Sequence, residues 1–176
     1  MLIAFFAVSS APAEAFESVC IDPGHGGYDS GIMSGVKEKD IALSIARKAA
    51  EFLKRNGKKV YLTRDVDRFL SLGERIAAAN RFKPDVFVSV HLSNTGDFAV
   101  YVDWYRNQDP ELALKEYYLL TSRQGQFIEK SKALADHIET SLKAEFGLNV
   151  FHREISLPIL NSMWAPAVLI EVPSRG

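Results

Sequence analysis

Four side chains of types that bind metals or transfer protons are spread along this sequence. They are His25, Glu38, His91 and Glu171. Two imidazoles and one carboxylate, with a fourth position left to water, form a common ligand set of catalytic zinc. Bound zinc lowers the pKa of that water to about 7, which makes a nucleophile at neutral pH. A second carboxylate can take the proton of the water and pass it to a leaving nitrogen.

Each of these residues also has an ordinary structural interpretation. His25 follows a glycine-rich turn and could serve only as a hydrogen-bond donor. His91 could be a core residue at the end of a buried strand, with its ring nitrogens hydrogen-bonded. Glu38 lies within Lys-Glu-Lys-Asp, where a solvated charge near a helix start is the usual outcome. Glu171 follows an apolar run directly and is harder to explain in this way. The residues alone leave the metal site and these roles open.

The elements expected around these residues alternate between strands and helices. The alternation predicts a single α/β domain, with a mostly parallel twisted sheet of about six strands and helices on both faces. Such sheets bind ligands beyond the carboxyl ends of their strands, and three of the four residues stand at such ends. The predicted strands are 18–22, 59–63, 86–90, 99–105, 155–160 and 167–172; the predicted helices are 72–82, 129–146, a short one over 110–120, and one from a cap at Asp40 to a stop at Asn56-Gly57.

The glycine-rich stretch 22–27 offers a phosphate cradle as a rival interpretation. A strand, a glycine-rich loop and a helix do follow one another here, which is the order that anion sites use. However, the stretch lacks Gly-Lys-Ser/Thr, and its glycines are not spaced as Gly-x-Gly-x-x-Gly. We therefore do not expect nucleotide binding.

Composition narrows the class of protein further. The chain has 176 residues, 47% of them hydrophobic, and a formal net charge of -1, which fits one globular domain. No basic stripe indicates nucleic acid, and the longest apolar run, 1–8, is too short to span a bilayer. The single cysteine, Cys20, excludes an intramolecular disulfide and is expected in the core.

The first fifteen residues differ from the rest of the chain. An apolar run over 1–8, a turn-prone stretch and Ala13-Glu14-Ala15 fit a signal peptide with a small-x-small cleavage site. The alternative is an N-terminal strand or disordered segment. We predict that residues 1–15 are a signal peptide and that 16–176 form the mature domain.

Several blocks occur in the order found in one enzyme family. From about residue 18 to 172 the sequence resembles the zinc-dependent N-acetylmuramoyl-L-alanine amidases of the Amidase_3 family, which act in bacterial cell-wall turnover and division. The resemblance implies that one zinc ion is bound by His25, Glu38 and His91, with Glu171 as the catalytic base and acid. The matching blocks are Ile21 to Gly31, Glu38-Lys39-Asp40, Thr63-Arg64 with Asp67, Leu72, Arg75 and Ala79-Asn80, then Ser89-Val90-His91 and Pro166 to Glu171.

The resemblance also implies a substrate and a cellular location. The bond cut would be the amide between N-acetylmuramic acid and L-alanine in peptidoglycan. We assign Asp22 to holding the first loop or orienting His25, because residues behind a metal ligand tune it. We expect an exported monomer, in the periplasm first and the cell wall or exterior second. It would span no membrane, bind no nucleic acid and have an activator protein as a candidate partner.

The chain departs from the family pattern at three places. The family continues after the glutamate block into a C-terminal helix, for which 172–176 offers no counterpart, so domain 16–176 is expected to lack it. The segment 92–96 is shorter than the family's usual segment at this place. The stretch 106–128 is only a modest insertion, whereas some division amidases carry an inserted helix that plugs the zinc site. Two other functions stay open: a peptidoglycan-binding module without catalysis, and a zinc peptidase acting on other amides.

Overall fold

The computed structural model describes residues 16–31, 35–104 and 123–174. The expected signal peptide and the expected short helix over 110–120 lie outside the described residues, so both stay predictions. Among the described residues, no helix is both long and apolar enough to cross a membrane.

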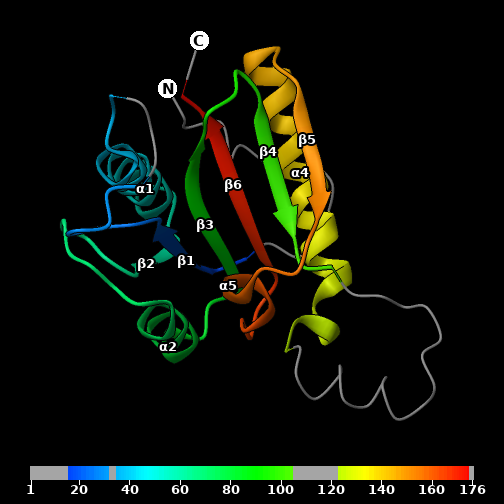
Figure 1. Ribbon diagram of the computed structural model, residues 1–176. Coiled ribbons are helices and arrows are strands. Elements are labelled where there is room, and N and C mark those ends of the chain that lie inside the picture. Colours follow the sequence, from blue (N-terminus) through cyan, green and yellow to red (C-terminus); the bar gives the residue numbers. More distant parts are fainter. Residues whose placement is uncertain (1–15, 32–34, 105–122, 175–176) are drawn as a thin grey trace.

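Within the described residues, six strands form one sheet in the order β2-β1-β3-β6-β4-β5 (Figure 1). β1 pairs in parallel with β2 and β3, β3 pairs in parallel with β6, and β4 pairs in parallel with β5. The pairing of β4 with β6 is antiparallel. The predicted single α/β domain with a mostly parallel sheet is confirmed. The strands are β1 (Ser18–Pro23), β2 (Lys59–Leu62), β3 (Val86–Ser93), β4 (Phe98–Val102), β5 (Val150–Glu154) and β6 (Ala167–Pro173).

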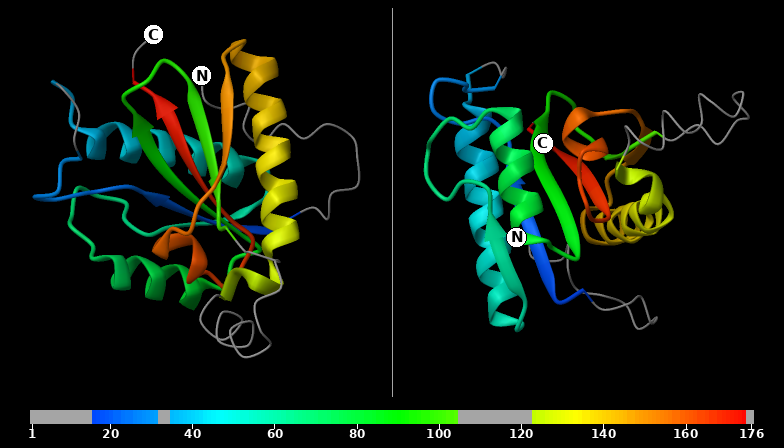
Figure 2. Two further views of the ribbon diagram at one scale, coloured as in Figure 1. Left: turned by 45° about the vertical axis from the view of Figure 1, so that its right-hand side comes forward. Right: turned by 90° about the horizontal axis from the view of Figure 1, so that it is seen from below.

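Helices cover both faces of the sheet, as predicted. The helices α1 and α4 share one hydrophobic core with the strands, whereas α2 and α5 contribute to a second core on the opposite face. Figure 2 shows α4 alongside β4 and β5 at one end of the sheet and α1 at the other end. The helices are α1 (Glu38–Arg55), α2 (Leu72–Phe82), α4 (Ile128–Phe146) and α5 (Pro158–Asn161), with a 3-10 turn η2 (Arg123–Gln126) before α4.

The alternation of side chains along the strands decides which residues meet at the site. Val88 and Val90 of β3 lie in the core with α1, and Phe87 lies in the core with α2. Successive side chains of a strand point to opposite faces, so His91 shares the face of Phe87. Glu171 of β6 shares that face too, because Leu169 packs in the same core as Phe87.

The predicted strand over 155–160 is wrong. The last edge strand is β5, Val150–Glu154, which pairs in parallel with β4 from Phe98↔Val150 onward. Pro158 opens the short helix α5 instead, since its fixed φ and missing N–H suit the first helical position. The apolar residues of 155–160 had suggested a strand, but pairing with β4 selected the more polar segment before them.

The predicted cap at Asp40 is also wrong. The helix α1 begins at Glu38, two residues earlier, so Asp40 lies in its first turn. The capping position is Lys37, whose side chain makes no capping hydrogen bond. Cys20, in contrast, is fully buried as expected.

Candidate metal centre

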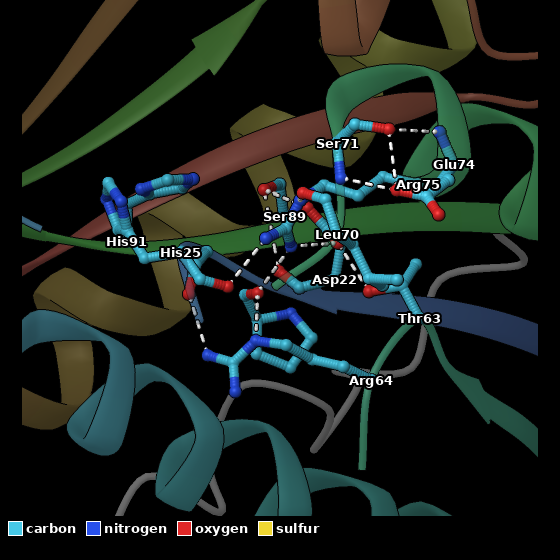
Figure 3. A network of polar contacts seen from close by, with 12 residues as sticks. Asp22, His25, Thr63, Arg64, Leu70, Ser71, Glu74, Arg75, Ser89 and His91 are labelled. Atoms are coloured by element: carbon cyan, nitrogen blue, oxygen red, sulfur yellow. Dashed lines mark hydrogen bonds and ion pairs between the residues drawn. The ribbon is translucent and has the colours of Figure 1, made fainter. Parts of the chain in front are cut away.

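Three of the predicted residues converge on one point at the carboxyl end of the central strands. The ligand-type atoms of His25, Glu38 and His91 all lie within 4.8 Å of one another. Glu38 Oε1 lies 3.2 Å from His25 Nε2 and 2.9 Å from His91 Nδ1. The two imidazole rings meet edge to face, with centroids 5.0 Å apart, and lie together in Figure 3. The loop after β1, the start of α1 and strand β3 thus supply one side chain each.

Glu38 is a buried carboxylate, with only 5% of its surface exposed. Burial alone would raise its pKa, but hydrogen bonds from His25, His91 and the backbone N–H of Leu92 hold the pKa well below its usual range. Pairing with Glu38 in turn raises the pKa of His25, although burial opposes this. Glu38 is therefore an ionised group facing two imidazoles, and the solvated-charge interpretation does not describe it.

The orientation of His25 is set by Asp29. His25 Nδ1 lies 2.9 Å from Asp29 Oδ1, which leaves Nε2 to face Glu38. A carboxylate on the far nitrogen fixes the tautomer of a metal-binding imidazole. Burial would raise the pKa of Asp29, but its hydrogen bonds with His25 and the Gly31 N–H lower it. The sequence placed Asp29 in a motif block but gave it no role; its spacing of four residues from His25 was the available signal.

Two glycines let the three side chains approach so closely. A Cβ at Gly24 would lie 2.3 Å from Cε1 of the His91 ring. A Cβ at Gly31, whose φ is +72°, would lie 2.5 Å from the Cβ of Glu38. Such distances are far below van der Waals contact, so any side chain at these positions would displace a ring or carboxylate of the site.

Asp22 anchors the loop that carries His25, as Figure 3 shows. Its buried carboxylate accepts hydrogen bonds from Arg75 Nη1 at 2.9 Å, from Ser89 Oγ at 3.1 Å and from the Thr63 hydroxyl. Arg75 Nη2 also donates to the carbonyl of His25 at 2.6 Å. His25 has a left-handed backbone with φ of 58°, a conformation that costs energy and is often found at functional sites. Asp22 thus reaches His25 through Arg75, and the imidazole itself is held by Asp29.

A second arginine completes this support. Arg64 is fully buried and donates to the carbonyls of Pro23 at 3.0 Å, Gly24 at 2.7 Å and Lys39 at 2.8 Å. These bonds satisfy buried backbone acceptors at the end of β1, in the loop after it and in the first turn of α1, and leaving such acceptors unpaired would destabilise the fold. Arg64 and Arg75 had no assigned role in the sequence; their place in motif blocks was the only signal.

Glu171 lies on the strand next to that of His91, one of the three converging residues. In the parallel register of β3 and β6, His91 stands opposite Glu171. Glu171 is half-buried, and its Oε2 accepts a hydrogen bond of 3.0 Å from the hydroxyl of Tyr101 on β4. Burial, and then this bond, raise the pKa of Tyr101. No local sequence pattern indicated that Tyr101 would reach Glu171.

The described residues contain one other group that could hold a cation, on α4 and β5. It consists of Asp136, Glu139 and His152, all at least partly exposed. Lys143 already pairs with Glu139 at 2.5 Å. The site around Glu38 differs because its carboxylate is buried and both imidazoles face it.

The donor set around Glu38 fits zinc. Two imidazole nitrogens and a carboxylate oxygen are a known catalytic zinc set, and the buried, ionised Glu38 needs a positive partner. A model of the N-acetylmuramoyl-L-alanine amidase family Amidase_3 matches residues 19–173. This chain belongs to that family. The family expected from the sequence motifs is therefore confirmed.

Individual relatives agree with the family match. The endolysin of Bacillus phage SPP1 is 36% identical over 156 residues, covering 87% of this chain and 53% of the endolysin. The N-acetylmuramoyl-L-alanine amidase AmiA of Escherichia coli K12 is 30% identical over 184 residues, covering 87% of this chain and 64% of AmiA. The chain thus spans between about half and two thirds of the length of these curated relatives.

The fold is also similar to that of a solved amidase. The structure of N-acetylmuramoyl-L-alanine amidase AmiC2 of Nostoc punctiforme superimposes with a TM-score of 0.68 at 28% identity, covering 88% of this chain and 78% of AmiC2. Since the match covers most of both chains, the α/β domain described above is the amidase fold.

Proposed function

We propose that this chain is a zinc-dependent amidase that hydrolyses the bond between N-acetylmuramic acid and L-alanine in peptidoglycan. The observation that carries the proposal is the position of Glu171 on β6, opposite His91, which is one of three converging ligand-type side chains. A carboxylate next to a metal site, and outside its ligand set, is what metal-assisted hydrolysis needs for proton transfer. Membership of the amidase family supports the choice of bond.

In this mechanism His25, Glu38 and His91 hold one zinc ion. Zinc, when bound, supplies Lewis-acid activation of a water and of the scissile carbonyl. Asp29 holds Nδ1 of His25, so Nε2 is the nitrogen that would be presented to the metal. Because Glu38 is buried and ionised, it offsets part of the charge of the cation.

Glu171 moves the proton. Its carboxylate takes one from the attacking water and delivers it to the leaving nitrogen of L-alanine. A carbon–oxygen bond forms, the carbon–nitrogen bond breaks, and the products are a lactyl carboxylate and a peptide with a free amine. Tyr101 donates to Oε2 of Glu171 and so restrains the orientation of this carboxylate.

Cellular location and partners form a second part of the proposal. We place the protein outside the cytoplasmic membrane, in the periplasm first, acting in cell-wall turnover or daughter-cell separation. The apolar 1–8 segment and the Ala13-Glu14-Ala15 site support this. Mass determination of the protein recovered from separate periplasmic and cytoplasmic extracts tests it: a chain starting at Phe16 in the periplasm agrees, and an intact chain starting at Met1 in the cytoplasm contradicts it.

The activity is tested by digesting purified peptidoglycan with residues 16–176, with and without chelator. Mass spectrometry of the soluble fraction should find stem peptides that begin with a free L-alanine amine. Chelator should abolish their release, and added zinc should restore it. A folded, zinc-loaded protein that leaves the peptidoglycan intact would contradict the proposed activity.

A further inference from the structure

Tyr28 is the most exposed large apolar side chain among the described residues, with 83% of its surface accessible. It stands at the tip of a tight turn, in which Gly26 and Asp29 exchange backbone hydrogen bonds of 2.8 and 3.2 Å. That turn follows His25 directly. An exposed aromatic ring next to a candidate active site calls for a functional explanation more than an isolated surface residue does.

The ring does not stand alone. Tyr28 stacks on Phe69, with ring centroids 4.3 Å apart and planes inclined by 22°. Phe69 is itself 38% exposed, so the pair forms an apolar surface shared by two loops, the one after β1 and the one after β2. Figure 1 shows these two loops meeting at one side of the molecule. We refer to this pair as the Tyr28–Phe69 stack.

Polar contacts fix the loop beneath the stack. The N–H of Gly27 donates to Asp67 Oδ1 at 2.8 Å, and Lys39 Nζ donates to the carbonyl of Gly27 at 2.7 Å. Lys39 also pairs with Asp67 Oδ2 at 2.6 Å and is itself buried. A rigid aromatic surface loses little conformational entropy when a ligand covers it, so such a surface is suited to binding.

We propose that the Tyr28–Phe69 stack binds a sugar ring of the glycan strand during the amidase reaction, an inference that rests on the proposed function. Pyranose rings present a face of C–H groups that packs on aromatic rings. In the substrate, only an ether oxygen and one carbon separate the muramic ring from the scissile carbonyl. The Cα atoms of Tyr28 and His25 are three residues apart, so they lie within about 11 Å of each other.

The charges around the stack favour the glycan over the stem peptide. Asp29 and Asp67 flank it, with 43% and 45% of their side-chain surface exposed. Their oxygens can accept hydrogen bonds from sugar hydroxyls and from the N-acetyl N–H. Lys39 neutralises Asp67, so Asp29 is the carboxylate that repels the carboxylates of a stem peptide. The stack therefore suits an uncharged ring that is rich in hydroxyls.

The test compares two substrates that contain the same scissile amide. One is a disaccharide muropeptide, and the other is the D-lactyl peptide without the sugar. For Tyr28→Ala, KM for the muropeptide should rise about three- to tenfold with kcat unchanged, since aromatic packing contributes on this scale. The D-lactyl peptide should be cleaved as by wild type. Tyr28→Phe should keep the wild-type KM, as should Phe151→Ala, which removes an exposed aromatic ring on β5.

Two outcomes for Tyr28→Ala would overturn the proposal. One is an equal loss of activity on both substrates, which indicates a displaced His25 loop, and the other is an unchanged KM for the muropeptide.

A binding measurement distinguishes failure of this proposal from failure of the proposed function. An oligomer of N-acetylglucosamine should shift the amide NMR signals of the turn 26–29 in wild type and leave them in place in Tyr28→Ala. This result is independent of turnover, so it decides the proposal even if wild type cleaves neither substrate. No shift in wild type would overturn it.

Discussion

His91 and Glu171 stand opposite each other on the parallel strands β3 and β6. The backbone ladder of the sheet thus fixes the spacing between a metal-ligand candidate and the proposed proton carrier. Sites built on strands hold their geometry better than sites built on loops alone. His25, from the loop after β1, and Glu38, from the first turn of α1, bring their side chains to His91.

Glu171→Gln should lower kcat by about 10²- to 10⁴-fold while zinc content stays at the wild-type level, because proton transfer is lost and the ligands remain. Kinetics on a soluble muropeptide and metal analysis of the same preparation check this. Glu154→Gln, on the exposed edge strand β5, is the matched control and should be fully active. Loss of zinc from Glu171→Gln would contradict the assigned role.

Tyr101→Phe should lower kcat about three- to tenfold at unchanged KM. The hydroxyl makes a charge-assisted hydrogen bond to Glu171, and its loss frees the carboxylate to rotate. The same substitution in the Glu171→Gln background should have almost no further effect, because it acts through that carboxylate. Additive losses in the double variant would show that Tyr101 does not work through Glu171.

His25→Ala and His91→Ala should each lose zinc and activity together. Zinc at roughly 1,000 times its Kd should stabilise the wild-type protein by about 4 kcal/mol, which thermal unfolding would show as a raised Tm. Neither variant should respond to the same zinc concentration. His137→Ala, on the exposed face of α4, is the control and should respond as wild type does. A full zinc response in either site variant would remove that histidine from the ligand set.

Arg75→Met should reduce the free energy of unfolding by about 3 to 5 kcal/mol, because it leaves Asp22 as an unpaired buried charge. The double variant Asp22→Asn/Arg75→Met should recover part of that loss. Urea unfolding measures both. Arg81→Met, at an exposed position of the same helix, should stay within about 0.5 kcal/mol of wild type. An equally small effect at Arg75 would show that the Asp22 network does not hold the loop.

The lowered pKa of Asp85 predicts that the stability of the protein depends on pH. Burial would raise its pKa, but hydrogen bonds from the Glu17 and Ser18 backbone and from the Ser18 hydroxyl lower it. A carboxyl whose pKa is lower in the folded protein than in the unfolded protein stabilises the fold at pH values above its unfolded-state pKa of about 3.9. This stabilisation is lost as the pH falls through the pKa of the folded state. Asp85→Asn should therefore be less stable than wild type near about pH 6, with a gap that narrows toward about pH 3. A gap that widens on acidification would contradict this.

The elements that are encoded by a local pattern of residues were predicted from the sequence. Helix 72–82 has a capping box at Ser71 and Glu74 and ends where expected, and the buried strand leading to His91 is a continuous apolar run. Asp29 and Tyr101 were not predicted. Tyr101 meets Glu171 across 70 residues, through the antiparallel pairing of β4 with β6, and no local pattern encodes that pairing.

The most direct test is the site of ¹⁸O incorporation when a soluble muropeptide is hydrolysed in ¹⁸O-labelled water. The proposed amidase activity predicts label in the lactyl carboxylate of N-acetylmuramic acid and an unlabelled peptide with a free L-alanine amine. Label in a carboxyl group within the peptide would mean that a peptide bond was cut, and would contradict the proposed amidase activity.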